Sequence, residues 1–520
     1  MKLITAAEAA NLIESGNTVI MSGSGQGHVV AESILVQVED RFRSTGMPRD
    51  VTLVHVGGTG DRAKRGPAHF AHEGLLKRSI TSAPIDAPPL FQLILDNKIE
   101  SYVLPMGVLS QLMREIAGGR PGVITKTGLH TFVDPRQLGG RQSAKTKDDV
   151  VEVVRLNDEE WLHYKPFKID VALLRGTTAD EDGNITMEQE AVLGEMLSTA
   201  QAVRRNGGIV IVQVKRLAQR NTLPPRQVKI PGILVDYVVH DPEQWQTYAT
   251  EYNPSFSGEL RVPFDAMKPL PFSVRKIIAR RAAMELYPGA ICNLGAGIST
   301  GISFIAAEEK VLDAVVLTNE QGFIGGAPQT GVEGGTAQNY VANVDQTYQF
   351  DFYDGGGLDL AFLSFPMVDA TGNVNVSRFG NKLVGVGGFI NISQYAKKVI
   401  FSGTFTAGEL EVEADNGNLR IVKEGKHKKF VSEVEQICYN GKFAESQGRQ
   451  VMFVTERAVF DYSDGALELV EIAPGVDLER DVLAHMEFRP RISSTLKTMD
   501  SRLFRNEHMG LREMVLANTK

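Results

Sequence analysis

Glu320 has surroundings suited to covalent chemistry. It follows an apolar segment, residues 314–318, that predicts a buried strand, and the loop after it, residues 321–326, contains three glycines. Open α/β sheets bind their ligands where strands end. A carboxylate at such a place can act as a nucleophile, and the amides of nearby glycines can stabilise a developing oxyanion. Glu320 is therefore a candidate nucleophile, with an ordinary strand-end acid before a turn as the alternative.

A second candidate is a glycine turn between a predicted strand and a predicted helix at residues 302–310. The turn consists of Gly295, Ala296, Gly297, Ile298, Ser299, Thr300 and Gly301. Such a turn brings backbone amides close to a phosphate or carboxylate at a helix N-terminus. A tight turn without a ligand is the alternative.

Two other interpretations of this turn fit less well. Its spacing, G-x-G-x-x-x-G, is one residue longer than the dinucleotide-binding fingerprint, in which Glu320 would bind a ribose. A ribose-binding acid does not need the glycine-rich loop that follows Glu320. Residues 297–301 also match the G-x-S-x-G nucleophile elbow, with Ser299 as the nucleophile. Two residues separate this motif from its strand, and no downstream histidine stands out as its base.

A third glycine cluster, residues 385–388, leads into the mainly apolar residues 389–392, and residues 355–357 are three further glycines. Packing alone explains one such cluster, whereas several in one half of the chain indicate a ligand. His69, His72 and Glu73 predict a solvated helix face rather than a metal site, because no other His or Cys cluster completes one. The basic residues within 423–429 also predict a solvated face, with contact to nucleotide phosphates as the alternative.

An internal repeat shows which elements position these candidates. A buried strand, a Gly-Asn turn and a second apolar strand occur twice in one register, at residues 169–177, 183–184 and 209–212 and again at residues 358–366, 372–373 and 398–401. A helix, an apolar strand and glycines also open each half, at residues 5–27 and 275–297. Such alternation predicts a mainly parallel sheet covered by helices. We therefore predict an α/β protein with two related domains, at residues 1–265 and 270–520, joined by a proline-rich junction.

Composition limits the classes of function. A chain of 520 residues is too long for one ordinary hydrophobic core, so two or more domains are expected. Its content of 42% hydrophobic and 23% charged residues is typical of a globular protein. A net charge of -8 argues against a nucleic-acid partner, because phosphate binding needs a basic field. Cys292 and Cys438, the only cysteines, predict buried thiols in a reducing compartment. Neither a membrane span nor a secretory signal is evident, so we expect a cytoplasmic enzyme without a membrane partner.

Several blocks of the sequence resemble class I CoA-transferases. Residues 318–326 are similar to the loop in which the glutamate of these enzymes forms a thioester with CoA. Residues 349–359 and 385–393 narrow the resemblance to the propionate or acetate CoA-transferase branch. Further matching blocks are residues 71–75, 131–136 and 471–478. The resemblance extends over nearly the whole chain.

The resemblance implies two NagB-like open-sheet α/β domains fused in one chain, with the active site between them. It implies that Glu320 is the catalytic glutamate, that Gly387 and Gly388 lie close to the reacting thioester, and that Gly295 to Ser299 line the acyl or CoA pocket. It also implies a homotetramer or homodimer, with CoA as a substrate and neither a metal nor a redox cofactor.

Met106 departs from the family pattern. The chain reads Pro105-Met106-Gly107 where relatives generally have Pro-Gln-Gly. In the family that glutamine lines the site and can donate an amide hydrogen bond, which a thioether cannot. The choice of acid is therefore open, and acetate, propionate, butyrate, lactate and 3-hydroxy acids all remain candidates.

The chemistry suits these residues. A carboxylate with a pKa of about 4.3 must displace a thiolate with a pKa of about 8.5, an uphill step through a mixed anhydride. Oxyanion donors and binding energy from the distant part of CoA are needed more than a general base. The sequence thus predicts transfer of CoA between short-chain acyl-CoA and a free carboxylate through a glutamyl-CoA thioester. An acyl-CoA hydrolase on the same fold and a non-catalytic ligand-binding member are the alternatives.

Overall fold

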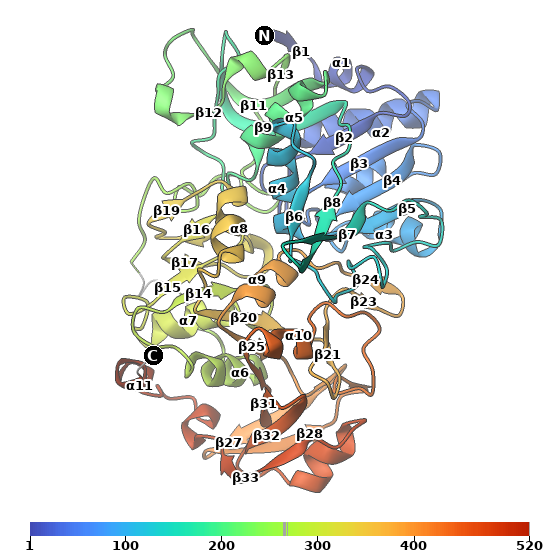
Figure 1. Cartoon of the computed structure of the whole chain (residues 1–520). Helices are drawn as coiled ribbons and strands as arrows, with labels where there is room; N and C mark the ends of the chain where they lie inside the picture. Colours follow the sequence, from blue (N-terminus) through green and yellow to red (C-terminus); the bar gives the residue numbers. More distant parts are fainter. Residues whose placement is uncertain (264–266, 268, 519–520) are drawn as a thin grey trace.

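The computed structural model describes residues 1–263, 267 and 269–518 (Figure 1). It contains two large sheets, one within residues 2–240 and one within residues 291–498, which confirms the predicted α/β class with two open sheets. The first half lies at the top of Figure 1 and the second half below it. The predicted junction falls partly on residues 264–266 and 268, outside the described residues, so the division at 1–265 and 270–520 stays a prediction.

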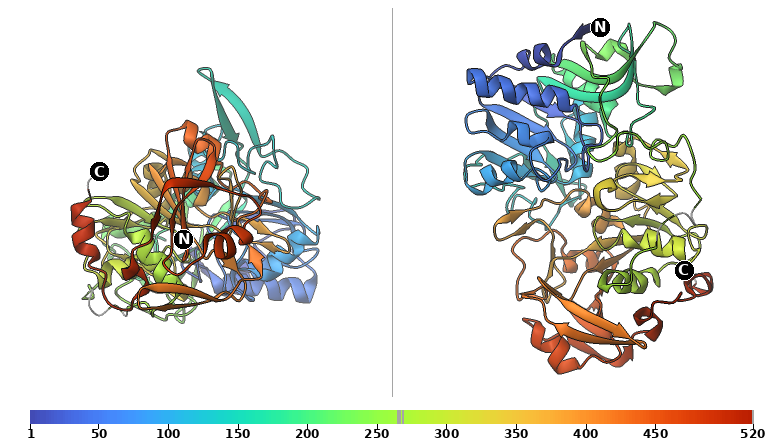
Figure 2. Two further views of the ribbon diagram at one scale, coloured as in Figure 1. Left: turned by 90° about the horizontal axis from the view of Figure 1, so that it is seen from below. Right: turned by 180° about the vertical axis from the view of Figure 1, so that it is seen from behind.

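The first sheet has a central path of parallel strands. In order these are β1 (Lys2–Ile4), β13 (Tyr237–His240), β11 (Ile209–Ala218), β9 (Val171–Asp180), β2 (Thr18–Met21), β3 (Val51–His55), β4 (Leu76–Thr81) and β5 (Glu100–Val103). The short strands β10 (Ile185–Thr186) and β12 (Val228–Ile230) extend it antiparallel. A separate sheet is formed by β6 (Val123–Thr125), β8 (Glu159–Tyr164) and β7 (Val151–Leu156), and the β7–β8 hairpin projects from the body in the left view of Figure 2.

Helices cover both faces of this sheet, which explains its nearly continuous apolar strands. The helices are α1 (Ala6–Asn11), α2 (Glu32–Thr45), α3 (Pro88–Leu95), α4 (Met106–Ala117) and α5 (Met196–Arg205). Successive residues of one strand point to opposite faces. Accordingly, Val19 packs in the cluster with helices α1 to α3, whereas its neighbour Ile20 packs in the cluster with α4 and α5.

The second sheet repeats this plan and adds antiparallel strands at both edges. Its order is β19 (Ala342–Asn343), β16 (Phe323–Ile324), β15 (Val316–Thr318), β14 (Ile291–Leu294), β20 (Leu360–Ser364), β25 (Lys398–Ser402), β30 (Gln450–Val454), β31 (Ala458–Ser463), β32 (Ala466–Ile472) and β33 (Arg491–Thr498). Its helices are α6 (Val274–Ala283), α7 (Gly301–Glu308), α8 (Gln346–Asp354), α9 (Phe389–Tyr395), α10 (Gly441–Ser446) and α11 (Leu511–Ala517). Two-stranded pairs complete this half: β17 (Ala327–Pro328) with β18 (Ala337–Gln338), β21 (Met367–Val368) with β22 (Val374–Asn375), β23 (Arg378–Phe379) with β24 (Lys382–Leu383), β26 (Thr406–Ala407) with β29 (His427–Lys428), and β27 (Glu411–Asp415) with β28 (Asn418–Lys423).

The internal repeat is real in three dimensions. Val171 pairs with Ile209 in the first sheet, and Leu360 pairs with Lys398 in the second, at the offset that the sequence predicted. A pair of aspartates fixes the start of the matching strands. Asp170 Oδ2 accepts a hydrogen bond from the N–H of Thr18 at 2.9 Å, and Asp359 Oδ2 accepts one from the N–H of Ile291 at 3.0 Å.

The Gly-Asn turns repeat as well. Asp180 Oδ1 accepts hydrogen bonds from the N–H groups of Asp182 and Asn184, at 3.0 and 2.9 Å. In the second half, Asp369 Oδ1 accepts from the N–H groups of Thr371 and Asn373, at 2.9 and 3.1 Å. Each aspartate also binds the amide of its own turn asparagine through Oδ2. Asp369 Oδ1 also accepts a hydrogen bond from the Thr371 hydroxyl at 2.8 Å. Each buried carboxylate thus satisfies at least three donors and stabilises its turn.

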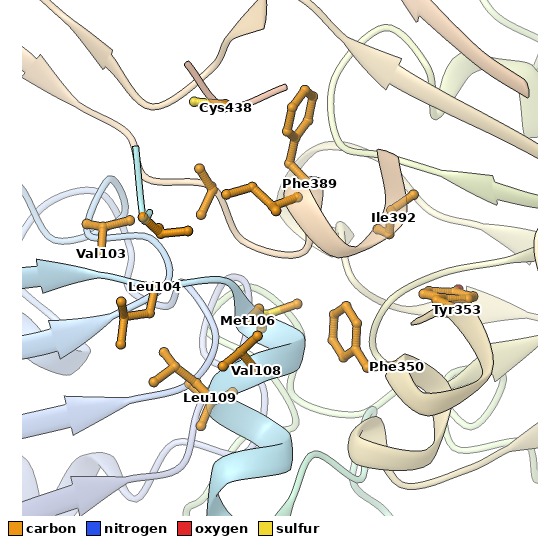
Figure 3. Packing of buried hydrophobic residues seen from close by; sticks show 14 of the residues in the cluster. Val103, Leu104, Met106, Val108, Leu109, Phe350, Tyr353, Phe389, Ile392 and Cys438 are labelled. Carbon is orange, nitrogen blue, oxygen red and sulfur yellow. The ribbon is translucent and has the colours of Figure 1, made fainter. Parts of the chain in front are cut away.

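One apolar core continues across the two halves. Val108 and Leu109 of α4 lie in the same buried cluster as Phe350 of α8 and Phe389 at the start of α9 (Figure 3). Ser110 on α4 and Thr347 on α8 are joined by a hydrogen bond between their hydroxyls at 2.7 Å. Helix α4 therefore packs directly against the second half.

Candidate active site

Strand β15 carries Glu320 to the carboxyl edge of the second sheet. Its last residue, Thr318, donates its hydroxyl to the backbone oxygen of Cys292 on the neighbouring strand at 2.9 Å. Tyr353 on α8 donates its hydroxyl to Thr318 Oγ1 at 2.8 Å, and Gln349 on the same helix donates to the backbone oxygen of Asn319 at 3.2 Å. These buried contacts fix the backbone immediately before Glu320.

The carboxylate of Glu320 lies under the glycine pair at residues 387–388. The N–H of Gly388 donates to Glu320 Oε2 at 3.0 Å, and Gln321 Nε2 lies at the longer distance of 3.5 Å from Oε1. A Cβ at position 388 would come within 2.1 Å of Oε2, so only glycine allows this approach. Gly387 adopts a φ of 50°, a left-handed conformation that also favours glycine.

Burial shifts the proton equilibrium of Glu320. Desolvation raises the pKa of its carboxyl from 4.5 to about 7, against the opposing hydrogen bonds from Gly388 and Gln321. The residue nevertheless keeps part of its surface exposed. A more basic carboxylate is a better nucleophile, and the higher pKa narrows the gap to a departing thiolate with a pKa of about 8.5.

The first half of the chain holds the glycine pair in place. The N–H groups of Val386 and Gly387 both donate to the backbone oxygen of Ser82, at 2.8 and 3.1 Å. The backbone oxygen of Gly387 accepts from the N–H of Met106 at 2.9 Å. Ser82 is itself fixed, because its hydroxyl donates to the backbone oxygen of Val56 at 2.6 Å. The surroundings of Glu320 are thus assembled from both halves.

The structure brings together four of the residues that the sequence singled out. Glu320, Gly387 and Gly388 are in contact, and Met106 reaches Gly387 through its backbone while its side chain is buried at the first residue of α4. Residues from Gly295 to Ser299 follow β14, the strand next to β15, so they lie at the same edge of the sheet. Ala296 and Gly297 are exposed there, which leaves the turn open to a ligand.

The nucleophile-elbow interpretation of that turn is wrong. Ser299 has no exposed surface, whereas an elbow serine must present its hydroxyl at the top of the sheet. Its hydroxyl also has no hydrogen-bond partner within the part of the chain that the structure describes. No base therefore activates it there.

The histidine pair is not a solvated helix face. His69 lies in a 3-10 turn (Gly66–Phe70), is almost fully buried, and contacts Glu39 through Nδ1 and Glu32 through Nε2. His72 binds the same Glu39 at 2.9 Å. The sequence missed this burial because the carboxylates come from α2, far along the chain. The prediction for the basic run holds for Lys423 and Lys426, which are exposed and pair with Glu409, but not for Lys429, which is buried.

Comparison with known proteins identifies the class. The sequence profile of the coenzyme A transferase family matches residues 3–241. The chain is 46% identical over 518 residues to the caffeate CoA-transferase of Acetobacterium woodii, covering 98% of both proteins. It is 44% identical over 509 residues to the acetate CoA-transferase YdiF of Escherichia coli K12, covering 98% of this chain and 96% of that protein.

Solved structures agree with this similarity. The crystal structure of the YdiF apoenzyme from Escherichia coli O157:H7 superposes with a TM-score of 0.94 at 44% identity, covering 98% of this chain and 97% of that one. A thioester complex of the same enzyme with CoA gives a TM-score of 0.93. The chain therefore belongs to the coenzyme A transferase family. It is an enzyme of CoA transfer, as the sequence predicted.

The sequence did not identify the first-half residues that complete the site. Ser82, Ser24 and His28 lie hundreds of positions from the second-half residues that they contact. The one available signal was the glycine-rich segment at residues 23–27, which follows β2 as residues 295–297 follow β14.

Proposed function

We propose that this protein transfers CoA between a short-chain acyl-CoA and a free carboxylate of the acetate or propionate type, through a glutamyl-CoA thioester on Glu320. One observation carries the proposal: a desolvated carboxylate at a strand end receives the N–H of Gly388 at 3.0 Å. The Glu320 carboxylate is thus both the nucleophile and the acceptor of an amide hydrogen bond.

The reaction has two stages. In the first, the Glu320 carboxylate attacks the acyl carbonyl and the carbon–sulfur bond breaks, so that CoA leaves as a thiolate and the acyl group stays on Glu320 as a mixed anhydride. The thiolate then attacks the Glu320 carbonyl, so that the original acid departs as a carboxylate and Glu320 holds CoA as a thioester. In the second stage, an incoming carboxylate runs both steps backwards. Protons need not be transferred in any step.

The glycine pair serves the second attack. As the thiolate adds to the Glu320 carbonyl, one carboxyl oxygen becomes an oxyanion. The N–H of Gly388 already points at Oε2, so it is organised for this charge before the reaction begins. The glutamyl intermediates also need protection from water. The packing of α4 against α8 and α9 supports an enclosed site between the halves.

The resemblance and the site together support further assignments. The turn from Gly295 to Ser299 would line the pocket for the acyl group or CoA through its exposed residues Ala296 and Gly297, because it lies next to the strand that carries Glu320. No metal or redox cofactor takes part in this scheme. The relatives are named for caffeate and acetate, so both plain and aromatic acids belong among the substrates to be tested.

We further propose a cytoplasmic homotetramer or homodimer. The buried, free state of Cys292 and Cys438 supports a reducing compartment.

A transfer assay tests the proposal. Acetyl-CoA should exchange with propionate, butyrate, lactate, 3-hydroxybutyrate and caffeate to different extents, and new acyl-CoA should be detected by chromatography. Without an acceptor acid, the protein should release at most one equivalent of acetate and no steady stream of free CoA, because Glu320 holds the CoA as a thioester. Steady release of CoA under that condition would instead identify an acyl-CoA hydrolase, and absence of any exchange would indicate a non-catalytic member.

A further inference from the structure

His28 connects the first half to the backbone that presents Glu320. The residue is completely buried, and its Nε2 lies 3.0 Å from the backbone oxygen of Gly334 in the second half. A carbonyl oxygen only accepts hydrogen bonds, so Nε2 must carry the proton and donate it. Nδ1 is then unprotonated, and no hydrogen-bond partner for it exists within the described part of the chain.

His28 is held rigidly on its own side of the contact. The N–H and backbone oxygen of His28 are both hydrogen bonded to Ser24, at 3.0 and 3.1 Å, which closes a tight turn. At Gly25, inside this turn, a Cβ would come within 2.8 Å of both Gly334 oxygen and the His28 ring. Glycine at position 25 therefore lets the two chain segments meet.

The contact leads to Glu320 through a short path. Gly335, which follows the residue that His28 binds, accepts a hydrogen bond from Asn319 Nδ2 at 3.2 Å. Asn319 Oδ1 accepts the N–H of Gln321 at 3.1 Å, so this asparagine braces the backbone on both sides of Glu320. A second tether from the first half joins the same segment, because the Thr250 hydroxyl donates to Glu333.

We propose that His28 is a positioning residue for the nucleophile. As a neutral imidazole, it fixes residues 331–335 of the second half, and these fix Asn319 and thereby Glu320. Burial lowers the pKa of His28 to about 4, so the ring stays neutral at the pH where the reaction runs. The residue touches neither substrate nor reacting atoms in this role, and its effect is on the placement of the Glu320 carboxylate.

Two substitutions of similar polarity separate this role from a general need for a buried polar group. The side chain of His28→Gln is long enough for its amide to donate to Gly334 in place of Nε2, whereas that of His28→Asn is too short. Small displacements of a nucleophile cost up to about 100-fold in rate. We expect His28→Asn to lower kcat for CoA transfer from acetyl-CoA to propionate by about 10- to 100-fold, with KM for acetyl-CoA changed less than about threefold. His28→Gln should stay within about threefold of the wild type in both constants.

Thr250→Val gives an independent test, since it is isosteric and removes only the second tether of the same segment. It should lower kcat by a smaller factor, about three- to tenfold, again without a matching change in KM. Equal activities of the Asn and Gln variants, a loss confined to KM, or an unchanged kcat in Thr250→Val would overturn the positioning role.

The proposal rests on the proposed function, and a single-turnover measurement of thioester formation from acetyl-CoA, made on the wild type and on His28→Asn, separates the two. A wild type that forms no thioester contradicts the function itself. A wild type that forms it at the same rate as His28→Asn contradicts only the positioning role.

Discussion

The two halves of this protein share the same sheet arrangement, but of two matching strands only the one in the second half is closely followed by a carboxylate. Strand β3 of the first sheet occupies the place of β15 in the second, because each pairs with the strand that opens its half. Following the paired registers, Val54 corresponds to Thr318 and Val56 to Glu320. Val56 is a buried apolar residue whose backbone oxygen receives the Ser82 hydroxyl.

The difference shows that the two halves of a repeated fold can have different roles in one site. The second half supplies the nucleophile and the Gly388 amide at its sheet edge. The first half supplies no reacting group at the matching position. Instead it contacts the glycine pair through Ser82 and Met106, and Gly334 through His28. The sheet is common to both halves, whereas the contacts between the halves complete the surroundings of Glu320.

The largest expected effect comes from separating the halves. Residues 1–265 and 270–520, expressed apart, should show no measurable transfer, since the second half alone lacks the contacts of Ser82 and Met106 with Gly387. Each half would also expose part of the apolar core around α4 and α8. A coupled assay of acetyl-CoA with propionate measures this, with the two halves co-expressed as the control. Transfer by residues 270–520 alone would contradict the claim that the first half helps to build the site.

The next largest effect is the dependence of activity on pH through Glu320. The first half has Val56 at the matching position, which does not titrate. Only the ionised carboxylate attacks, and its pKa is about 7. The kcat/KM for acetyl-CoA should therefore fall about tenfold per unit below pH 7, rather than below the ordinary glutamate range. A flat profile between pH 5.5 and 7.5 would contradict the raised pKa.

The same shift has a defined sign for stability. The folded state binds the Glu320 proton more tightly than the unfolded state does, so this group's contribution to stability falls as the pH rises from 4.5 to about 7. Glu320→Gln should therefore raise the free energy of unfolding by about 1–3 kcal/mol at pH 8 and leave it unchanged at pH 4. Urea unfolding at both pH values measures this.

Met106 tests the contribution of the first half to substrate choice. Its thioether donates no hydrogen bond, so Met106→Gln should shift relative kcat/KM toward hydroxylated acids by about 2- to 10-fold, the value of one hydrogen bond. Met106→Leu is the matched control, because it fills similar space without a donor. If lactate and propionate respond alike to Met106→Gln, the side chain at position 106 does not act on the acyl group.

The smallest effect concerns what the halves have in common. Asp180 and Asp369 share three hydrogen bonds in matching turns, and Asp369 accepts a fourth from the Thr371 hydroxyl. Replacing either by alanine should cost a similar amount, about 1–3 kcal/mol in urea unfolding, with kcat unchanged. A much larger cost in one half than in the other would show that the turns do not have equivalent roles.

The sequence predicted the two sheets because the patterns that indicate their strands and turns are local. Apolar runs, Gly-Asn turns and glycine turns recur within a few residues of one another, and the register of β9 with β11 and of β20 with β25 follows from them. Glu320 was found for the same reason, since its strand and loop are contiguous. The contacts from Ser82 and His28 were not predictable, because each joins residues about 300 positions apart without any periodic pattern. His69 was misjudged for the same cause, as its partners lie on another helix.

A covalent adduct on Glu320 is the most direct test of the mechanism. The protein is incubated with acetyl-CoA in the absence of an acceptor acid, the thioester is trapped by borohydride reduction or hydroxylamine, and the peptides are analysed by mass spectrometry. The label should fall on the peptide that contains Glu320. Glu320→Ala should give no label and no transfer, and Glu320→Asp should lose most activity because the carboxylate is withdrawn by one methylene. A label on Ser299 or on a cysteine, or full transferase activity in Glu320→Ala, would contradict the account.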